Sequence, residues 1–358
     1  MNRCIAGALA GFALLSLAAA PAIAEPATSV LNPKPIQGFG PAPKATGPGA
    51  PVQMIKVHGR SLEGNLEGDA VDRDVVVVLP PSYAKSHRRY PVLYFLHGFG
   101  LTGDWFAAFM HVPETMLAAA AKGQEFIVVL PDTDTKFGGS MYSNSPTTGD
   151  FESFVADDLT AYIDSHYRTI AKRSGRGLVG HSMGGYGTWK IAMDHPEKWA
   201  AMYAMSACCM SARKETLESA TKMSQLTVEQ AASGNFGVKA GVASLVAWSP
   251  DPKAAPFFAD LPLKDGAVDQ SVLDRWAANS PIVMASAHVP QLKSFVAIAS
   301  DGGDKDGLTK DATLMHQELD RFGIQNSFQV YDGNHTNHIA ERFQSEVLPF
   351  FQAHLQLK

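Results

Sequence analysis

The stretch LVGHSMGGYGTW, residues 178–189, places one serine among glycines at the end of an apolar run. Its centre, Gly180-His181-Ser182-Met183-Gly184, is a G-x-S-x-G pattern that follows a predicted strand and precedes a predicted helix. At such a sharp turn the serine takes a strained backbone conformation, and the flanking glycines let neighbouring chain approach without a Cβ clash. The pattern predicts that Ser182 is a nucleophile whose Oγ projects from the carboxyl end of a strand, above a helix N-terminus that favours negative charge.

Short apolar runs alternate with helical patterns on both sides of this turn. The runs are continuously hydrophobic, as strands are when helices cover both faces of a sheet. The sequence therefore predicts the α/β class, with a doubly wound and mostly parallel sheet. A helix is predicted at 151–167, with its apolar stripe in the core. The predicted strands are 75–79, 91–97, 126–130, 177–180, 201–206, 295–300 and 327–331.

A long segment interrupts this rhythm before the strand predicted at 295–300. Residues 212 to about 285 combine Lys-, Glu-, Ser- and Ala-rich helical sequence with the loop WSPDPKAAPFFADLPL. In such folds the loops diversify at the sheet edge that bears the active site, so we predict a helical insertion over that edge. Residues 52–358 are predicted to form a single catalytic domain, and no internal repeat is found in them.

The N-terminal residues indicate export. Arg3 precedes an apolar run that ends in Ala22-Ile23-Ala24, the small-x-small pattern that signal peptidase accepts. We predict a signal peptide over residues 1–24 and a periplasmic or extracellular mature chain without a membrane span. A membrane anchor is the alternative, but the run is rich in small residues and breaks at Pro21. Residues 25–51, crowded with Pro, Gly and Ala, predict an extended linker.

Composition excludes several classes of protein. With 358 residues, 46% of them hydrophobic and 18% charged, the chain can bury a large core. The net charge of -5 and a single dense basic run, KSHRR at 85–89, leave no electrostatic footprint for nucleic acid. After removal of the predicted signal peptide, the adjacent Cys208 and Cys209 remain. Because neighbouring cysteines could form only a strained small ring, we expect them to be reduced and buried.

A second loop is predicted to take part in the same reaction as Ser182. FLHGFG, residues 95–100, follows a predicted central strand and resembles a loop that supplies one backbone amide to an oxyanion hole. We predict that the amides of Phe99 and Met183 donate to the oxygen that gains charge in a tetrahedral intermediate. A glycine-rich turn without a ligand is the alternative. His181 is expected to be a packed neighbour rather than the base, because its side chain should point away from Ser182 Oγ.

Several segments together carry a family resemblance. With LPPSY (79–83), YPVLYFLHG (90–98) and Phe-Glu-x-Phe (151–154), the GHSMGG turn resembles the esterase D-like family of α/β-hydrolases. That family includes S-formylglutathione hydrolases, feruloyl and acetylxylan esterases, and mycobacterial mycolyltransferases. The similarity covers roughly residues 55–355. It implies an α/β-hydrolase fold and a Ser-Asp-His triad in that chain order, with no metal or organic cofactor.

A serine nucleophile needs a general base, and the base needs an orienting carboxylate. The last predicted strand ends at Tyr331 and DGNHTNH follows, so His335 falls in a loop at the predicted catalytic edge. The family carries Gly-x-His here, and the resemblance assigns the base to His335. His338 is the alternative. A metal site that joins both histidines to Asp332 lacks an accompanying carboxylate motif and would leave the serine without a base.

The orienting acid lies in ASDGGDKDGL, residues 299–308, where three aspartates compete. A calcium loop is the first alternative, but with Gly307 at its sixth position the ligands of its first and twelfth positions are missing. The family pattern after this strand is Gly-x-x-Asp, and the resemblance assigns the acid to Asp306. Asp301, at the strand end, and Asp304 remain alternatives.

These residues lead us to expect an exported serine carboxylesterase that acts on aryl, feruloyl or acetyl esters, as small molecules or linked to a polysaccharide. Tyr142 and Asn144, in MYSNSP, are predicted to line the substrate site. The family often has an aromatic residue shortly after the catalytic histidine, and residues 336–340 have none. Two alternatives are acyl transfer to a sugar or lipid alcohol, and a non-catalytic binding module on a hydrolase scaffold. An intact serine, histidine and acid set argues against the latter.

Overall fold

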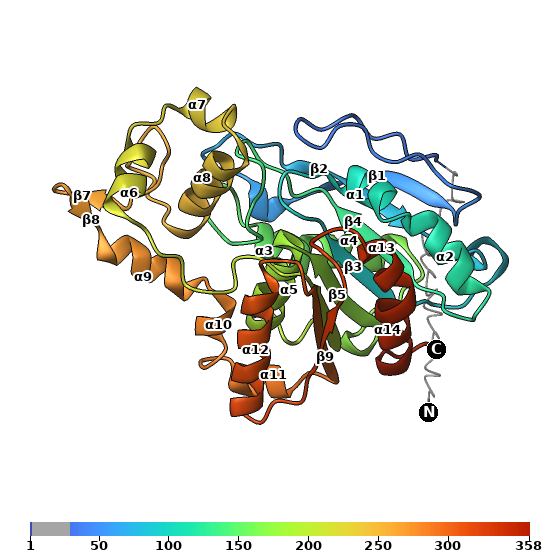
Figure 1. The fold of residues 1–358 in the computed structure, drawn as a ribbon. Coiled ribbons are helices and arrows are strands. Elements are labelled where there is room, and N and C mark those ends of the chain that lie inside the picture. The colour runs from blue at the N-terminus through green and yellow to red at the C-terminus, as the bar shows by residue number, and fades with distance from the viewer. Residues whose placement is uncertain (2–28) are drawn as a thin grey trace.

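The computed structural model describes Met1 and residues 29–358, so the predicted signal peptide beyond Met1 and the first residues of the predicted linker lie outside the described residues. The described chain is built around an eight-stranded sheet of order β1-β2-β4-β3-β5-β6-β9-β10. β2 pairs antiparallel with β1 and β4, whereas the other neighbours are parallel. The predicted mostly parallel sheet is confirmed (Figure 1). The strands are β1 Val52–His58, β2 Asp72–Val78, β3 Val92–Leu96, β4 Ile127–Pro131, β5 Arg176–His181, β6 Ala201–Met205, β9 Ala297–Gly303 and β10 Ser327–Tyr331.

Helices cover both faces of the sheet, as expected from the continuous apolar runs of β3, β4 and β6. All residues of β3, β4 and β6 are buried. Along β3, Tyr94 faces one core while Leu93 and Phe95 face the other, as the two-residue period of a strand requires. The first core is covered by α4 (Thr160–His166), α5 (Met183–Asp194), α11 (Val289–Lys293) and α12 (Thr309–Arg321). The second is covered by α1 (Gly103–Phe109), α2 (Val112–Ala120), α13 (Ile339–Arg342) and α14 (Leu348–His354).

β1 is the strand of this sheet that sequence reasoning missed. It lies at the edge of the sheet, and its burial is patchy: Val52 and Val57 are buried, whereas Met54 and Lys56 between them are exposed. A search for continuous apolar runs finds strands that are covered on both faces, so it passes over an edge strand of this kind.

The segment predicted as one helix, residues 151–167, is helical but not uniform. α3 (Phe151–Ser153) leads into a π-helical stretch at Phe154–Leu159, and α4 continues from there. The predicted apolar stripe lies in the core, where each member is fully buried: Phe151, Phe154, Val155, Leu159 and Ile163.

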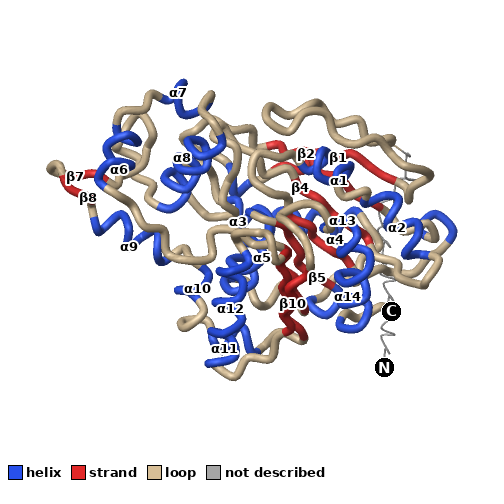
Figure 2. Tube along the Cα trace, in the orientation of Figure 1, coloured by secondary structure: helices blue, strands red, loops and turns tan. Residues whose placement is uncertain are grey.

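The predicted insertion forms a largely helical lobe between β6 and β9 (Figures 1 and 2). Side-chain hydrogen bonds fasten it to the sheet domain: Ser145 Oγ donates to Val246 O at 2.7 Å, and Tyr186 Oη donates to Asn279 O at 2.9 Å. Its elements are α6 Leu217–Ser224, α7 Val228–Ala232, α8 Phe236–Trp248, the hairpin of β7 Leu263–Lys264 and β8 Ala267–Val268, α9 Gln270–Ala278 and α10 Pro281–Met284.

The described part of the predicted linker, residues 29–51, is irregular apart from one bridge between Ile36 and Gly40. It packs beside the helices of the second core. Trp105 Nε1 donates to Gly40 O at 3.2 Å, and Ala50 N donates to Pro113 O at 2.7 Å. Within the part of the chain that the structure describes, no helix has the length and apolar character needed to cross a membrane.

Candidate active site

The turn that carries Ser182 joins β5 to α5. Ser182 has φ 59° and ψ -117°, a conformation that L-residues rarely adopt and that is found where function requires strain. The glycines on either side allow it: a Cβ on Gly184 would lie 2.0 Å from Leu96 O, and one on Gly180 would lie 2.1 Å from Gly184 O. The G-x-S-x-G pattern is therefore required by the close approach of β3 and α5 to this turn.

Loops from three strands bring Ser182, His335 and Asp306 together. Ser182 Oγ lies 3.0 Å from His335 Nε2, and His335 Nδ1 lies 2.8 Å from Asp306 Oδ2. The Asp306 side chain is 4% exposed and that of His335 is 34% exposed. Asp306 Oδ1 also accepts from Leu308 N at 3.0 Å, so the carboxylate is fixed at both oxygens. In this geometry an imidazole that donates from Nδ1 leaves its Nε2 lone pair for the serine proton.

The two competing aspartates have other partners. Asp301 is fully buried, and its Oδ2 accepts from Arg342 Nε at 2.7 Å and from Tyr203 Oη at 2.9 Å. Asp304 Oδ1 accepts from Gly333 N at 2.9 Å, which ties the turn after β9 to the loop that carries His335. Both side chains therefore hold elements of the fold together.

His338 and Asp332, which were considered with His335 for metal binding, have partners outside the triad. His338 Nδ1 pairs with Glu341 Oε2 at 3.0 Å, and Asp332 forms an ion pair with Lys305. Among residues 29–358, no group of three or more His, Cys, Asp or Glu side chains is arranged to hold a metal ion.

His181, next to the nucleophile, holds the loop of the predicted base. Its ring is buried, stacks near Phe106 and His335, and places Nε2 2.9 Å from His335 O. Burial, with a smaller contribution from His335, lowers the pKa of His181 to about 3. The imidazole is therefore neutral at ordinary pH, and a hydrogen on Nε2 can donate to the carbonyl of His335. This agrees with the expectation of a packed neighbour.

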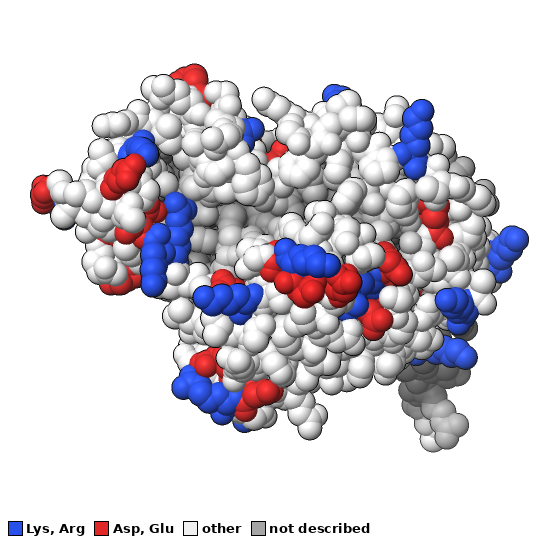
Figure 3. Space-filling view, viewed as in Figure 1, with Lys and Arg blue, Asp and Glu red and all other residues white. Residues whose placement is uncertain are grey.

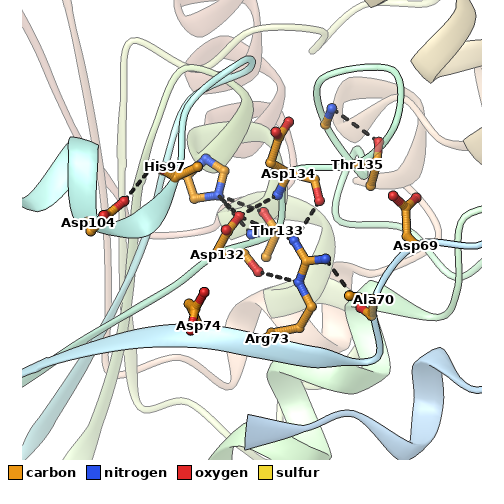
Figure 4. Close-up of polar contacts among 12 residues, drawn as sticks. Asp69, Ala70, Arg73, Asp74, His97, Asp104, Asp132, Thr133, Asp134 and Thr135 are labelled. Atoms are coloured by element: carbon orange, nitrogen blue, oxygen red, sulfur yellow. Dashed lines mark hydrogen bonds and ion pairs between the residues drawn. The ribbon is translucent and has the colours of Figure 1, made fainter. Parts of the chain in front are cut away.

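The loop with the second predicted oxyanion donor is fixed by His97, which Figure 4 shows in contact with Thr133. His97 is fully buried, and burial lowers its pKa, so the ring is neutral. Its Nδ1 donates to Gly98 O at 2.9 Å, while its Nε2 accepts from Thr133 N at 2.9 Å. Gly98 C=O and Phe99 N–H belong to one planar peptide group. Because His97 holds the carbonyl, it also sets the direction of the Phe99 amide.

Arg73, on β2, fixes the turn that contacts His97. Arg73 is 7% exposed, and its Nε donates to Asp132 O at 3.0 Å while Nη2 donates to Asp134 O at 2.6 Å (Figure 4). These bonds fix the turn after β4 that presents Thr133 to His97. The loop lies beside the nucleophile, since a Cβ on Gly98 would be 3.4 Å from Ser182 Cβ. His97 was part of the predicted oxyanion loop, but nothing in the sequence connected it to Arg73.

Two residues that we predicted to line the substrate site have structural partners. Tyr142 is fully buried, and its hydroxyl donates to His97 O at 3.0 Å. Asn144 is exposed, but its amide bonds at both ends to Ser153, through Ser153 N at 3.0 Å and Ser153 Oγ at 2.9 Å. A fully buried tyrosine cannot touch a ligand without rearrangement, so we withdraw Tyr142 from the substrate site. Asn144 is exposed, and its place in the substrate site stays a prediction.

A hollow opens between the insertion and the rest of the domain, lined mainly by residues that are neither acidic nor basic (Figure 3). One cavity of about 320 Å³ lies between the insertion and the loop after β6, lined by Cys209, Ser211, Arg213, Gly237, Ala240, Gly241, Ser244 and Trp248. Phe236, at the start of α8, packs edge-on against Phe99 with ring centroids 5.2 Å apart. Cys208 and Cys209 are free cysteines as expected, but they are partly exposed rather than buried.

Comparisons with known proteins agree with this geometry. A family model described as putative esterase matches residues 70–355. Esterase Rv1288 of Mycobacterium tuberculosis is 38% identical over 127 residues, which are 34% of this chain and 26% of that protein. The endo-1,4-beta-xylanase/feruloyl esterase of Xylanibacter ruminicola is 35% identical over 130 residues, 34% of this chain and 18% of that protein. The match thus spans about a quarter or less of each relative.

Solved structures show the same architecture. A ferulic acid esterase superposes with a TM-score of 0.60 at 24% identity, over 84% of this chain and 97% of that chain. At this identity the likeness concerns the fold, and the predicted α/β-hydrolase fold is confirmed.

Proposed function

Because the chain belongs to the putative esterase family, which confirms the resemblance in its sequence, we propose that it is a serine carboxylesterase acting through Ser182, His335 and Asp306. The observation that carries the proposal is the unbroken line of hydrogen bonds from Asp306 through His335 to Ser182 Oγ. The strained backbone of Ser182, with φ 59°, supports the proposal because such strain is concentrated at functional sites.

In the proposed mechanism, Ser182 Oγ attacks the ester carbonyl and His335 Nε2 takes its proton. Asp306 holds the imidazole in the tautomer that accepts this proton and stabilises the resulting imidazolium. The amides of Phe99 and Met183 donate to the oxyanion of the tetrahedral intermediate. His335 then protonates the leaving alcohol, and a water molecule, activated by the same imidazole, releases the acid from Ser182.

The proposed substrates are aryl, feruloyl or acetyl esters, free or attached to a polysaccharide. Support comes from a relative named as a feruloyl esterase and a solved ferulic acid esterase with the same fold. The proposed site of action is the periplasm or the cell exterior, which follows from the N-terminal sequence.

The experiment compares the purified protein with Ser182→Ala on a panel of short aryl and feruloyl esters. We expect kcat/KM to fall by about four orders of magnitude or more, because the nucleophile is lost. Ser280→Ala is the matched control, since Ser280 is buried in the insertion and bonds to Trp276 O. Undiminished turnover in Ser182→Ala would refute the mechanism.

Two further readouts separate the proposal from its rivals. Product analysis with competing sugar and lipid alcohols should yield free acid rather than transferred ester; predominant transfer would identify an acyltransferase. A fluorophosphonate probe should label Ser182, and a protein that resists the probe would instead be a binding module on a hydrolase scaffold.

A further inference from the structure

The loop after β6 holds two adjacent cysteines in an unusual arrangement. Side chains of neighbouring residues in extended chain point to opposite sides, which would keep two sulfurs apart. Here Cys209 has φ 59°, in the left-handed region that non-glycine residues rarely adopt. The sulfurs of Cys208 and Cys209 lie 2.8 Å apart as a result. A strained backbone that brings two thiols into contact calls for a functional explanation.

This loop is attached to the nucleophile turn and to β9. Cys208 N donates to Ser182 O at 3.1 Å, the same carbonyl that accepts from Tyr186 N at 3.0 Å. Ser206 N, two residues earlier, donates to Asp301 O at 2.9 Å. Because both attachments lie within the same few residues, the cysteine pair has little freedom to move apart.

The pair is open to small molecules from one side. Cys209 lines the cavity of about 320 Å³ beneath α8, where Gly237, Ala240 and Gly241 present no bulky side chain. Cys208 is not among the residues that line this cavity, and the hydrogen bond with Cys209, and then burial, raise the pKa of the Cys208 thiol. An incoming reagent therefore meets Cys209 first, while Cys208 keeps its proton.

We propose that Cys208 and Cys209 form a redox modification site, which a small-molecule disulfide converts into a vicinal disulfide. Cys209 thiolate attacks one sulfur of the reagent RSSR, so that a mixed disulfide forms and RS⁻ leaves. Cys208 then loses its proton and attacks Cys209 Sγ, which releases the second thiol. In sum, two protein thiols and RSSR give one intramolecular disulfide and two RSH, so the two electrons pass from the cysteines to the reagent.

A disulfide between Cys208 and Cys209 would close a small, strained ring, which is why pairing was not expected from the sequence. The same strain determines how the disulfide reacts. Strain in a disulfide raises its reduction potential and makes the bond easy to reduce. The loop brings the sulfurs together before any bond exists, so ring closure needs little further movement. The modification is therefore reversible, and it changes the loop that holds the carbonyl of Ser182.

The test uses the purified full-length protein, reduced, freed of reductant and then treated with oxidised glutathione. The tryptic peptide 199–213 contains both cysteines and should lose the mass of two hydrogens. It should also resist alkylation until it is reduced. The readout is a mass and not a rate, so its outcome is independent of the proposed esterase activity.

Two serine variants test the order of steps. Cys208→Ser should accumulate a glutathione adduct on Cys209, because no second thiol is present to displace it. Cys209→Ser should neither lose two hydrogens nor gain an adduct at a comparable rate, because Cys208 does not line the cavity and its pKa is raised. Thermal unfolding of both variants shows whether they are folded. A wild-type peptide that keeps two alkylatable thiols, retains the glutathione adduct, or links to a second chain would overturn the proposal.

Discussion

Asp301 and Asp306 lie five residues apart at the end of the same strand, and both carboxylates are buried. Asp301 points into a structural cluster with Arg342 and Tyr203. Asp306, in the turn beyond the strand, points at His335. Burial does not distinguish them, since Asp301 and Asp306, taken as whole residues, are 0% and 8% exposed. Their partners do: Asp301 bonds to Arg342 and Tyr203, whereas Asp306 contacts the imidazole that it is proposed to orient.

The largest effect is expected for Asp306→Asn. An amide at this position can still accept from Leu308 N, but it no longer fixes the imidazole in the productive tautomer, so kcat should fall by about 10⁴-fold with little change in KM. Steady-state kinetics on a chromogenic ester measure this. Asp304→Asn is the control, and a loss of less than about tenfold in Asp306→Asn would show that another group orients His335.

Asp301→Asn should act on stability instead. Removing this charge leaves the guanidinium of Arg342, 12% exposed, without its ionic partner. The free energy of unfolding should drop by about 3 kcal/mol, a typical cost of breaking a buried ion pair. Urea unfolding reports the loss, and kcat per active site, titrated with a fluorophosphonate, should stay within about threefold of wild type. A stable but inactive variant would place Asp301 in the mechanism.

Buried His181 should make the stability of the fold depend on pH. His181 is buried with a pKa of about 3, below the value near 6.5 of an unfolded chain. Between these values the unfolded chain binds more protons, so stability falls as pH drops from about 6.5 towards 3. His181→Gln, which can still donate to His335 O, should lose less stability than wild type between pH 7 and pH 5. Urea midpoints at both values test this, and equal losses would contradict it.

Asp304→Ala should have the smallest effect. It removes the carboxylate that accepts from Gly333 N, while Lys305 N still donates to Gly333 O at 2.8 Å. We expect a loss of about 1 kcal/mol in unfolding free energy and less than a tenfold change in kcat/KM. Thermal melts and steady-state kinetics check both. A collapse of activity would mean that this bond alone positions the loop of His335.

The sheet and the turn of Ser182 could be anticipated because each depends on local pattern. Asp306 was selected among three aspartates, and His335 between two histidines, by the family resemblance. Strands buried on both faces give continuous apolar runs, and parallel strands bring their terminal loops to one edge. β1 was missed because its buried residues, Val52 and Val57, are separated by exposed ones and form no such run. The G-x-S-x-G turn has a steric cause that the structure displays directly, in the contact that a Cβ on Gly184 would make with Leu96 O.

The supporting contacts could not be anticipated because they join residues that are distant in sequence. Arg73 reaches the turn after β4 and so supports His97, and Tyr142 bonds to a carbonyl of the same loop. Tyr142 was placed at the substrate from its neighbourhood alone, and burial excludes it. The contact between Cys208 and Cys209 depends on the positive φ of Cys209, which the residue types at these positions do not predict.

The most direct test of the proposed triad is the rate of fluorophosphonate labelling in wild type, Asp306→Asn and Asp301→Asn, with the labelled residue located by peptide mapping. We expect label on Ser182 in all three, at similar rates in wild type and Asp301→Asn and at a rate lower by orders of magnitude in Asp306→Asn. Label on another residue, or equal slowing in both variants, would contradict it.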